Sequence, residues 1–310
     1  MTENTESTGT AAAATVSMRE ERRRTSDGLE LKCRIWAPAD PVGLIVIIHG
    51  LAEHGGRYCE TAEYFAGNGW AVFAGDLRGH GQSPDVPGAG RVHVNRFMDY
   101  FLDVSALIDL ARERHPRLPL FLLGHSMGGL ITLSFVLQNP EGLAGAVISS
   151  PALGTHPDFQ PPAFLRLLVG VLDRLAPRMR FPSDLDTQAI SRDPEVVRVY
   201  LADPLVSRKV SARWYAEIMR AMGRTHANAG SLTVPVLLMQ SGADRLVDPE
   251  APGRWALSAP AGQVELVEWE GLYHEMFNEP EKPEVRLRTL RWLQQQLART
   301  PAAEASQPGG

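Results

Sequence analysis

Apolar residues recur along the chain in short unbroken runs of about the length of a β-strand. Such runs, with no alternation of polar residues, are typical of parallel strands covered on both faces. The sequence predicts six of them, at Leu44–Ile48, Trp70–Ala74, Leu120–Leu123, Ala146–Ile148, Val236–Met239 and Val264–Val267. Ahead of them, Arg19–Arg24 and Leu29–Trp36 flank Ser26-Asp27-Gly28, which predicts an antiparallel hairpin on the sheet edge.

Helical stretches lie between several of these strands. The clearest has the 3.6-residue period of an amphipathic helix, with an apolar stripe formed by Phe97, Tyr100, Phe101, Val104, Leu107, Ile108 and Ala111. A second stripe near the end of the chain aligns Leu290, Leu293 and Leu297. Alternation of strands and helices predicts an α/β fold with a doubly wound, mostly parallel sheet.

One part of the chain breaks this alternation. Between Ala152 and Leu232 we find no convincing strand run, and helical pieces punctuated by proline occur instead, including Phe164–Leu175 and Trp214–Met222. We interpret this block as a helical cap inserted over the strand ends. The predicted division is a disordered tail at 1–17, an α/β core at 18–151 and 233–298, the helical cap at 152–232, and a disordered tail at 299–310.

Length and charge narrow the classes of function. The 310 residues suit one large α/β domain with an insertion, and 44% hydrophobic residues provide for a sizeable core. A formal net charge of −5 argues against a nucleic-acid partner. No apolar run reaches the length of about 18 residues that spans a bilayer.

Cysteine use and the N-terminal segment bear on the compartment. Cys33 and Cys59 stand singly, which favours free thiols, with a disulfide between them as the alternative. Residues 1–16 lack the basic region and leucine-rich core of a signal peptide. We therefore expect a cytoplasmic location.

The strongest chemical signal is Gly124-His125-Ser126-Met127-Gly128-Gly129, which contains the pattern G-x-S-x-G. It follows a predicted strand and precedes a predicted helix, Leu130–Leu137, which is the context that this motif requires. Its glycines leave room for a sharp turn, and the helix directs its first N–H groups at developing negative charge. The motif predicts that Ser126 is the nucleophile of a serine hydrolase with the α/β-hydrolase fold.

A serine nucleophile needs a base, and the base needs an acid that orients it. His274 stands after the final predicted strand and before the last helix, where the base of this fold belongs. The other eight histidines lie in glycine-flanked turns or in positions that do not follow a strand. Asp244 is the first carboxylate after the preceding strand and is the predicted acid. Asp248 is the alternative, although it could instead cap a following helix.

An oxyanion hole needs two backbone donors. The N–H of Met127, directly after the nucleophile, supplies one by geometry. We assign the second to the N–H of Leu51, in the loop that follows the strand Leu44–Ile48. No metal or organic cofactor is implied by this chemistry.

Several motifs together resemble the monoacylglycerol lipase family of α/β-hydrolases, and the resemblance covers nearly all of residues 34–297. The matching segments are His49–His54 with Arg57-Tyr58, Asp76–Ser83, Gly124–Gly129, Ser149–Pro151, Ser241–Arg245, Tyr273-His274 with Asn278-Glu279, and in the cap Ser191–Asp193, Tyr200 and Asp203–Leu205. The single motifs are shared with related lysophospholipases, whereas a matching cap is more specific.

The resemblance implies hydrolysis of a lipid ester, foremost a monoacylglycerol, to a fatty acid and glycerol through an acyl-enzyme. It places recognition of the glycerol head on Glu53, Arg57 and Tyr200. For Glu53 and Arg57, a salt bridge that braces the loop is an open alternative. Leu51 departs from the family, in which a smaller residue is common, and this points to a narrower acyl pocket.

Other functions are compatible with the same fold. A lysophospholipase or a general carboxylesterase would carry the same triad, and a catalytically inactive binding protein would keep the fold without the chemistry. Haloalkane dehalogenases and epoxide hydrolases have an aspartate at the elbow, where this chain has Ser126. The apolar stretch Phe164–Leu175 is expected to guide the acyl chain, to make peripheral contact with a membrane or lipid aggregate, or to be cap core.

Overall fold

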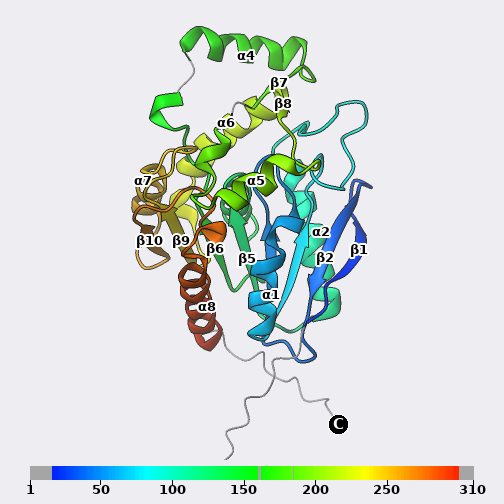
Figure 1. Ribbon diagram of the computed structural model, residues 1–310, viewed down its shortest axis with the longest axis vertical. Coiled ribbons are helices and arrows are strands. Elements are labelled where there is room, and N and C mark those ends of the chain that lie inside the picture. The colour runs from blue at the N-terminus through cyan, green and yellow to red at the C-terminus, as the bar shows by residue number, and fades with distance from the viewer. Residues whose placement is uncertain (1–15, 160–161, 184, 300–310) are drawn as a thin grey trace, which may run out of the picture.

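The computed structural model describes residues 16–159, 162–183 and 185–299. The two predicted disordered tails therefore lie almost wholly outside the described residues. Figure 1 shows one twisted sheet with helices on both faces and a group of helices beyond one end of the strands. This arrangement confirms the predicted α/β fold.

All eight predicted strands are present in one sheet, in the order β1-β2-β4-β3-β5-β6-β9-β10. Their bounds are β1 Arg19–Arg24, β2 Glu30–Trp36, β3 Gly43–Ile48, β4 Trp70–Gly75, β5 Leu120–His125, β6 Gly145–Ser149, β9 Val236–Ser241 and β10 Val264–Trp269. β1 and β2 form the antiparallel edge hairpin, β2 pairs with β4 antiparallel, and the strands from β4 to β10 pair in parallel. The carboxyl ends of these parallel strands consequently meet along one edge of the sheet.

The central strands are apolar throughout because both faces of the sheet are covered. In β3, Leu44, Val46 and Ile48 belong to one buried cluster, and Ile45 and Ile47 belong to the other. The helices against the sheet are α1 Cys59–Gly67 and α8 Lys282–Arg299 on the second cluster's face, and α2 Asp99–Arg114, α3 Met127–Val136 and α7 Ala251–Ser258 on the first. Both predicted helical stripes lie within these clusters.

The prediction that every parallel strand is covered on both faces is wrong for β10. This strand ends the sheet, and its Glu265, Leu266 and Glu268 are exposed. The two glutamates within the run V-E-L-V-E-W fit an edge position, since a charged side chain there stays in water.

Between β6 and β9 the chain runs beyond the strand ends (Figure 1). The elements there are α4 Ala163–Leu175, β7 Arg180–Pro182, α5 Pro194–Ala202, β8 Lys209–Ser211 and α6 Ala212–Ala227. β7 and β8 pair antiparallel, so the expectation that this block has no strand is wrong. Three-residue strands are too short to show a period in the sequence. Its definition as a separate cap at 152–232 stays a prediction.

Single turns of 3-10 helix complete the described elements. They are η1 Gly55–Tyr58, η2 Pro157–Phe159, η3 Thr187–Ala189, η4 Ala229–Ser231 and η5 Met276–Asn278. Cys33 and Cys59 are both free thiols, as the sequence favoured.

The start of α3 packs directly on the end of β3. A Cβ atom added to Gly128 would lie 2.1 Å from the carbonyl oxygen of Ile48 and 2.4 Å from that of His49. Both oxygens belong to the backbone, so neither can rotate out of the way. Only glycine therefore allows α3 to begin this close to the neighbouring strand.

We predict that Gly128→Ala lowers the free energy of unfolding by about 1–3 kcal/mol or more, because the added methyl overpacks a rigid site. Gly223→Ala in α6 is the matched control, since nothing lies within 4 Å of its added Cβ. That control should stabilise the protein by up to about 1 kcal/mol, as alanine favours a helix over glycine. Urea unfolding would measure both, and equal midpoints would contradict the packing argument.

Candidate active site

Ser126 lies at the sharp junction between β5 and α3. Its φ of 54° and ψ of −117° form a backbone conformation that residues with a Cβ rarely adopt. The neighbouring loop holds it there, since the Ser126 N–H donates to Ser149 O and the Ala152 N–H donates to Ser126 O, both at 3.0 Å. α3 begins at Met127, three residues before the predicted start, so the serine directly precedes the first helical turn.

The structure brings the three predicted triad residues together. His274 Nε2 lies 2.8 Å from Ser126 Oγ, and His274 Nδ1 lies 2.7 Å from Asp244 Oδ2. The other oxygen of Asp244 accepts hydrogen bonds from the N–H groups of Leu246 and Val247, at 2.9 and 3.1 Å. The carboxylate is therefore fixed by its own loop, with one oxygen left for the imidazole.

Burial and charge act in opposite directions on this pair. Burial alone would lower the pKa of His274, but the charge of Asp244 and the hydrogen bond to it raise that pKa above its ordinary value. Burial alone would raise the pKa of Asp244, whereas His274 and the two backbone N–H groups lower it. The arrangement keeps the carboxylate ionised and gives the imidazole the basicity to accept the proton of Ser126.

A second histidine lies beside this one. The rings of His125 and His274 are 4.8 Å apart between centroids. Burial, and then the charge of His274, lower the pKa of His125 to about 4. His125 is therefore neutral near pH 7 and adds no positive charge that would oppose protonation of His274.

Asp248, the alternative acid, is engaged elsewhere. Its Oδ1 accepts a hydrogen bond from the Glu250 N–H at 2.9 Å, and its other oxygen pairs with Arg254 in α7. Both contacts brace the start of that helix, although its N-cap residue is Glu250 and not Asp248. The carboxylate that faces His274 is that of Asp244.

The loop after β3, residues 49–54, packs against the nucleophile. A Cβ added to Gly50 would lie 3.3 Å from Ser126 Cβ. Glu53 Oε1 holds the loop by accepting hydrogen bonds from the Gly50 N–H at 2.6 Å and the Tyr58 hydroxyl at 2.8 Å. Leu51, one of the two residues predicted to supply the oxyanion hole, directly follows Gly50 and so lies near this contact. Met127, the other one, directly follows Ser126 in the chain.

The three residues that the resemblance assigned to the glycerol head also lie together. Arg57 contacts Glu53 at 2.8 Å, and its guanidinium lies 4.8 Å from the ring centroid of Tyr200. The same guanidinium makes two hydrogen bonds to Glu275, at 2.6 and 2.7 Å. These contacts are those of the bracing alternative. Glu275 was missed in the sequence, where its position next to His274 was the only signal.

Among the described residues, no three His, Cys, Asp or Glu side chains gather as a metal site would require. The hydrogen-bonded arrangement of Ser126, His274 and Asp244 has the geometry that nucleophilic attack by a serine with general acid–base assistance requires.

Comparison with known proteins places the chain among hydrolases. The family described as "Serine aminopeptidase, S33" matches residues 39–281. Monoacylglycerol lipase from Mycolicibacterium smegmatis is 38% identical over 269 residues, which are 86% of this chain and 93% of that protein. Phospholipase YtpA from Bacillus subtilis is 40% identical over 256 residues, 81% of this chain and 94% of that protein.

A solved structure supports the same family. The crystal structure of Paleococcus ferrophilus monoacylglycerol lipase superposes with a TM-score of 0.76 at 33% sequence identity, and the match covers 86% of this chain and 99% of that one. The chain is therefore an ester hydrolase that belongs to the monoacylglycerol lipase family of α/β-hydrolases, within the broader family described as "Serine aminopeptidase, S33".

Proposed function

We propose that the protein hydrolyses monoacylglycerols to a fatty acid and glycerol, with Ser126 as the nucleophile, His274 as the general base and Asp244 as the acid that orients it. The observation that carries the mechanism is the unbroken hydrogen-bond chain from Asp244 through His274 to Ser126 Oγ. The substrate class rests on the similarity to monoacylglycerol lipases over most of the chain.

The first half of the reaction forms the acyl-enzyme. His274 Nε2 takes the proton from Ser126 as Oγ attacks the ester carbonyl carbon, and the N–H groups of Leu51 and Met127 stabilise the oxyanion. Asp244 stabilises the imidazolium without taking its proton. His274 then protonates the departing glycerol oxygen, and a water activated by the same histidine later releases the fatty acid.

Glu53, Arg57 and Tyr200 complete the proposed site for the glycerol head. All three are buried or nearly so, and their mutual contacts keep them in fixed positions. A polar site whose groups are already oriented loses little entropy when it receives a small neutral polyol. Bracing of the loop and recognition of the head are compatible roles for the same side chains.

The outer side of α4 supports contact with a lipid aggregate. Phe164, Leu168, Val171 and Leu175 are 71, 46, 43 and 81% exposed. Their spacing of four, three and four residues places them on one stripe of the helix. This stripe lies opposite Asp173, which pairs with Arg213 and Arg220 of α6. We propose that this stripe touches the surface of a membrane or micelle from which the substrate is taken.

No helix among the described residues combines the length and the apolar character needed to cross a membrane. We propose a peripheral, cytoplasmic mode of contact in which the exposed stripe of α4 meets the lipid.

A substrate panel tests the proposed function directly. We expect kcat/KM to be highest for monoacylglycerols when they are assayed beside lysophospholipids and short p-nitrophenyl esters. Folded Ser126→Ala should lose nearly all hydrolysis and all labelling by a fluorophosphonate, because triad members act as a unit. A higher kcat/KM for lysophospholipids would replace the proposed substrate with the phospholipase alternative.

The assignment of the acid predicts different outcomes for two neighbouring aspartates. Asp244→Asn should lower kcat by about four orders of magnitude, because the imidazole tautomer is lost. Asp248→Asn is the matched control and should leave turnover nearly unchanged, since its contacts brace α7. The opposite ranking would transfer the role to Asp248.

The pKa of His274 predicts a pH dependence. Since the protonated imidazole cannot act as a base, kcat/KM should fall as the pH falls through this pKa. The charge of Asp244 raises that pKa, so for an uncharged ester the midpoint should lie above the ordinary value of about 6.5. In Asp244→Asn the residual activity should have its midpoint at lower pH, because burial then acts unopposed. A midpoint that does not move would contradict this account.

The exposed stripe predicts that presentation of the substrate matters. Leu168→Asp should lower the rate on a long-chain ester in micelles by roughly tenfold, since inserting one such side chain contributes about 1.5–3 kcal/mol. A short ester in solution should be hydrolysed almost as before. Leu257→Asp, at a site in α7 that is 89% exposed, is the matched control and should affect neither. An equal loss for both esters would show that Leu168 acts through the cap itself.

A further inference from the structure

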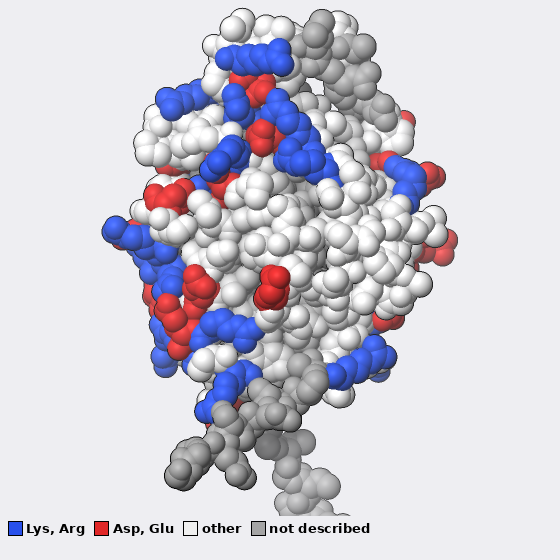
Figure 2. Space-filling model, turned by 180° about the vertical axis from the view of Figure 1, so that it is seen from behind, with Lys and Arg blue, Asp and Glu red and all other residues white. Residues whose placement is uncertain are grey.

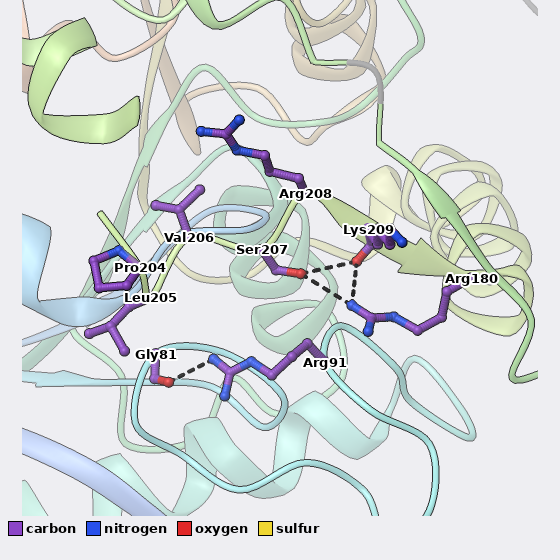
Figure 3. A pocket seen from close by; sticks show the side chains of 9 residues that line it. All are labelled: Gly81, Arg91, Arg180, Pro204, Leu205, Val206, Ser207, Arg208 and Lys209. Atoms are coloured by element: carbon purple, nitrogen blue, oxygen red, sulfur yellow. Dashed lines mark hydrogen bonds between the residues drawn. The ribbon is translucent and has the colours of Figure 1, made fainter. Parts of the chain in front are cut away.

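A surface pocket of about 460 Å³ lies outside the triad. It is lined by Gly81, Arg91, Arg180, Pro204, Leu205, Val206, Ser207, Arg208 and Lys209 (Figure 3). Four of these nine residues are cationic and none is acidic. Gathering like charges around one hollow is unfavourable unless an anion compensates them, so the composition of this lining indicates a ligand.

Two of the arginines are held in place at the pocket. Arg180 Nη2 donates to Ser207 Oγ at 3.4 Å and to the carbonyl oxygen of Lys209 at 3.3 Å, and Arg91 Nη2 donates to the carbonyl oxygen of Gly81 at 2.6 Å. Figure 3 shows the Ser207 hydroxyl beside the Arg180 guanidinium, and the Arg91 guanidinium directed at the carbonyl oxygen of Gly81. Arg180 Nε is buried and has no hydrogen-bond partner among the described residues.

Carboxylates pair with other arginines between β6 and β9, whereas only one of the four cations that line the pocket has such a partner. Arg213 and Arg220 both pair with Asp173. Figure 2, which shows the molecule from behind, has acidic side chains among the basic ones that gather over its upper part. In the pocket, Arg91 pairs with Asp85 at 3.7 Å. Within the described ranges, no carboxylate lies within 4.0 Å of the other three cations, Arg180, Arg208 and Lys209.

The pocket is next to the active site without being part of it. The Ser207 N–H donates to the carbonyl oxygen of Ala52 at 3.0 Å, in the loop that carries Leu51. Asp203, just before the lining segment 204–209, contacts His54 at 2.8 Å. A ligand in the pocket would therefore rest on a wall that is tied to the loop beside Ser126, at a distance from the reacting atoms.

We propose that this pocket binds a phosphate group, carried either by a small phosphate compound or by the head of an anionic phospholipid. Guanidinium groups match the geometry of phosphate oxygens, and the Ser207 hydroxyl adds a neutral donor. The apolar wall formed by Pro204, Leu205 and Val206 suits the carbon part of such a ligand. This binding site goes beyond the proposed hydrolysis, since it uses no triad residue and needs no ester.

The experiment compares Arg91→Gln/Arg180→Gln with wild type and with Arg117→Gln/Arg291→Gln. The control pair removes the same charge from two exposed positions outside the pocket. One arm titrates inorganic phosphate by calorimetry. The other measures co-sedimentation with vesicles of ether-linked phosphatidylcholine, with and without ether-linked phosphatidylglycerol. Ether lipids contain no carboxylic ester, so binding is read independently of hydrolysis, and the phosphatidylcholine arm accounts for contact through α4.

We expect the pocket variant to lose about tenfold in affinity for each arginine, while the control pair binds as wild type does. Loss confined to free phosphate identifies a small phosphate compound, and loss confined to the phosphatidylglycerol-dependent part of vesicle binding identifies a lipid head. Should the double variant not fold, Lys209→Gln at the exposed rim should still weaken binding by a smaller factor. Equal binding by the pocket and control variants, or no binding of either probe by wild type, overturns the proposal.

Discussion

The close contact between the start of α3 and the end of β3 is the constraint on which the site depends. Because Gly128 lets the two backbones touch, the turn after β5 is forced into the conformation that lifts Ser126 out of the sheet. Gly124 tightens the same turn, since a Cβ there would lie 2.5 Å from the carbonyl oxygen of Gly128. The contact also brings the loop after β3 beside the serine, so one packing requirement positions both Ser126 and the loop proposed to supply an oxyanion donor.

A buried carboxylate, that of Asp76, holds the residue that directly follows this loop, Gly55. Asp76 Oδ1 accepts hydrogen bonds from Arg34 at 2.6 Å and from the Gly55 N–H at 2.9 Å, and Oδ2 accepts one from the Gln82 N–H at 2.8 Å. Burial would raise the pKa of Asp76, but Arg34 and the Gln82 N–H lower it. An ionised group inside the protein is stable only with such a full set of partners. The motif at Asp76–Ser83, which contributed to the family resemblance, therefore supports the loop after β3, through Gly55 at its end and through the hydrogen bond from the Leu77 N–H to His49 Nε2 at its start.

Features with a local pattern could be predicted from the sequence, whereas features that depend on distant contacts could not. Buried parallel strands and the elbow have local signatures, so the sheet and Ser126 could be placed. The choice between Asp244 and Asp248 could not be made with certainty, because the two are four residues apart and only the direction of each side chain separates them. Glu275 was missed since its partner, Arg57, is remote in sequence. The exposed face of β10 was missed because its two glutamates were outweighed by the neighbouring apolar residues.

The sequence also could not predict which side of α4 faces the solvent, and this orientation matters for the proposed contact with lipid. A stretch that is apolar nearly all round does not reveal which side faces inward. In the structure, Asp173 is 3% exposed and pairs with arginines of α6, whereas Phe164 and Leu175 on the outside are 71 and 81% exposed. In water this outward apolar stripe is unfavourable by about 25 cal/mol for each Å² left exposed. The proposed contact of α4 with a lipid surface would remove this cost, which is a physical reason for the exposed stripe to lie toward the source of the substrate.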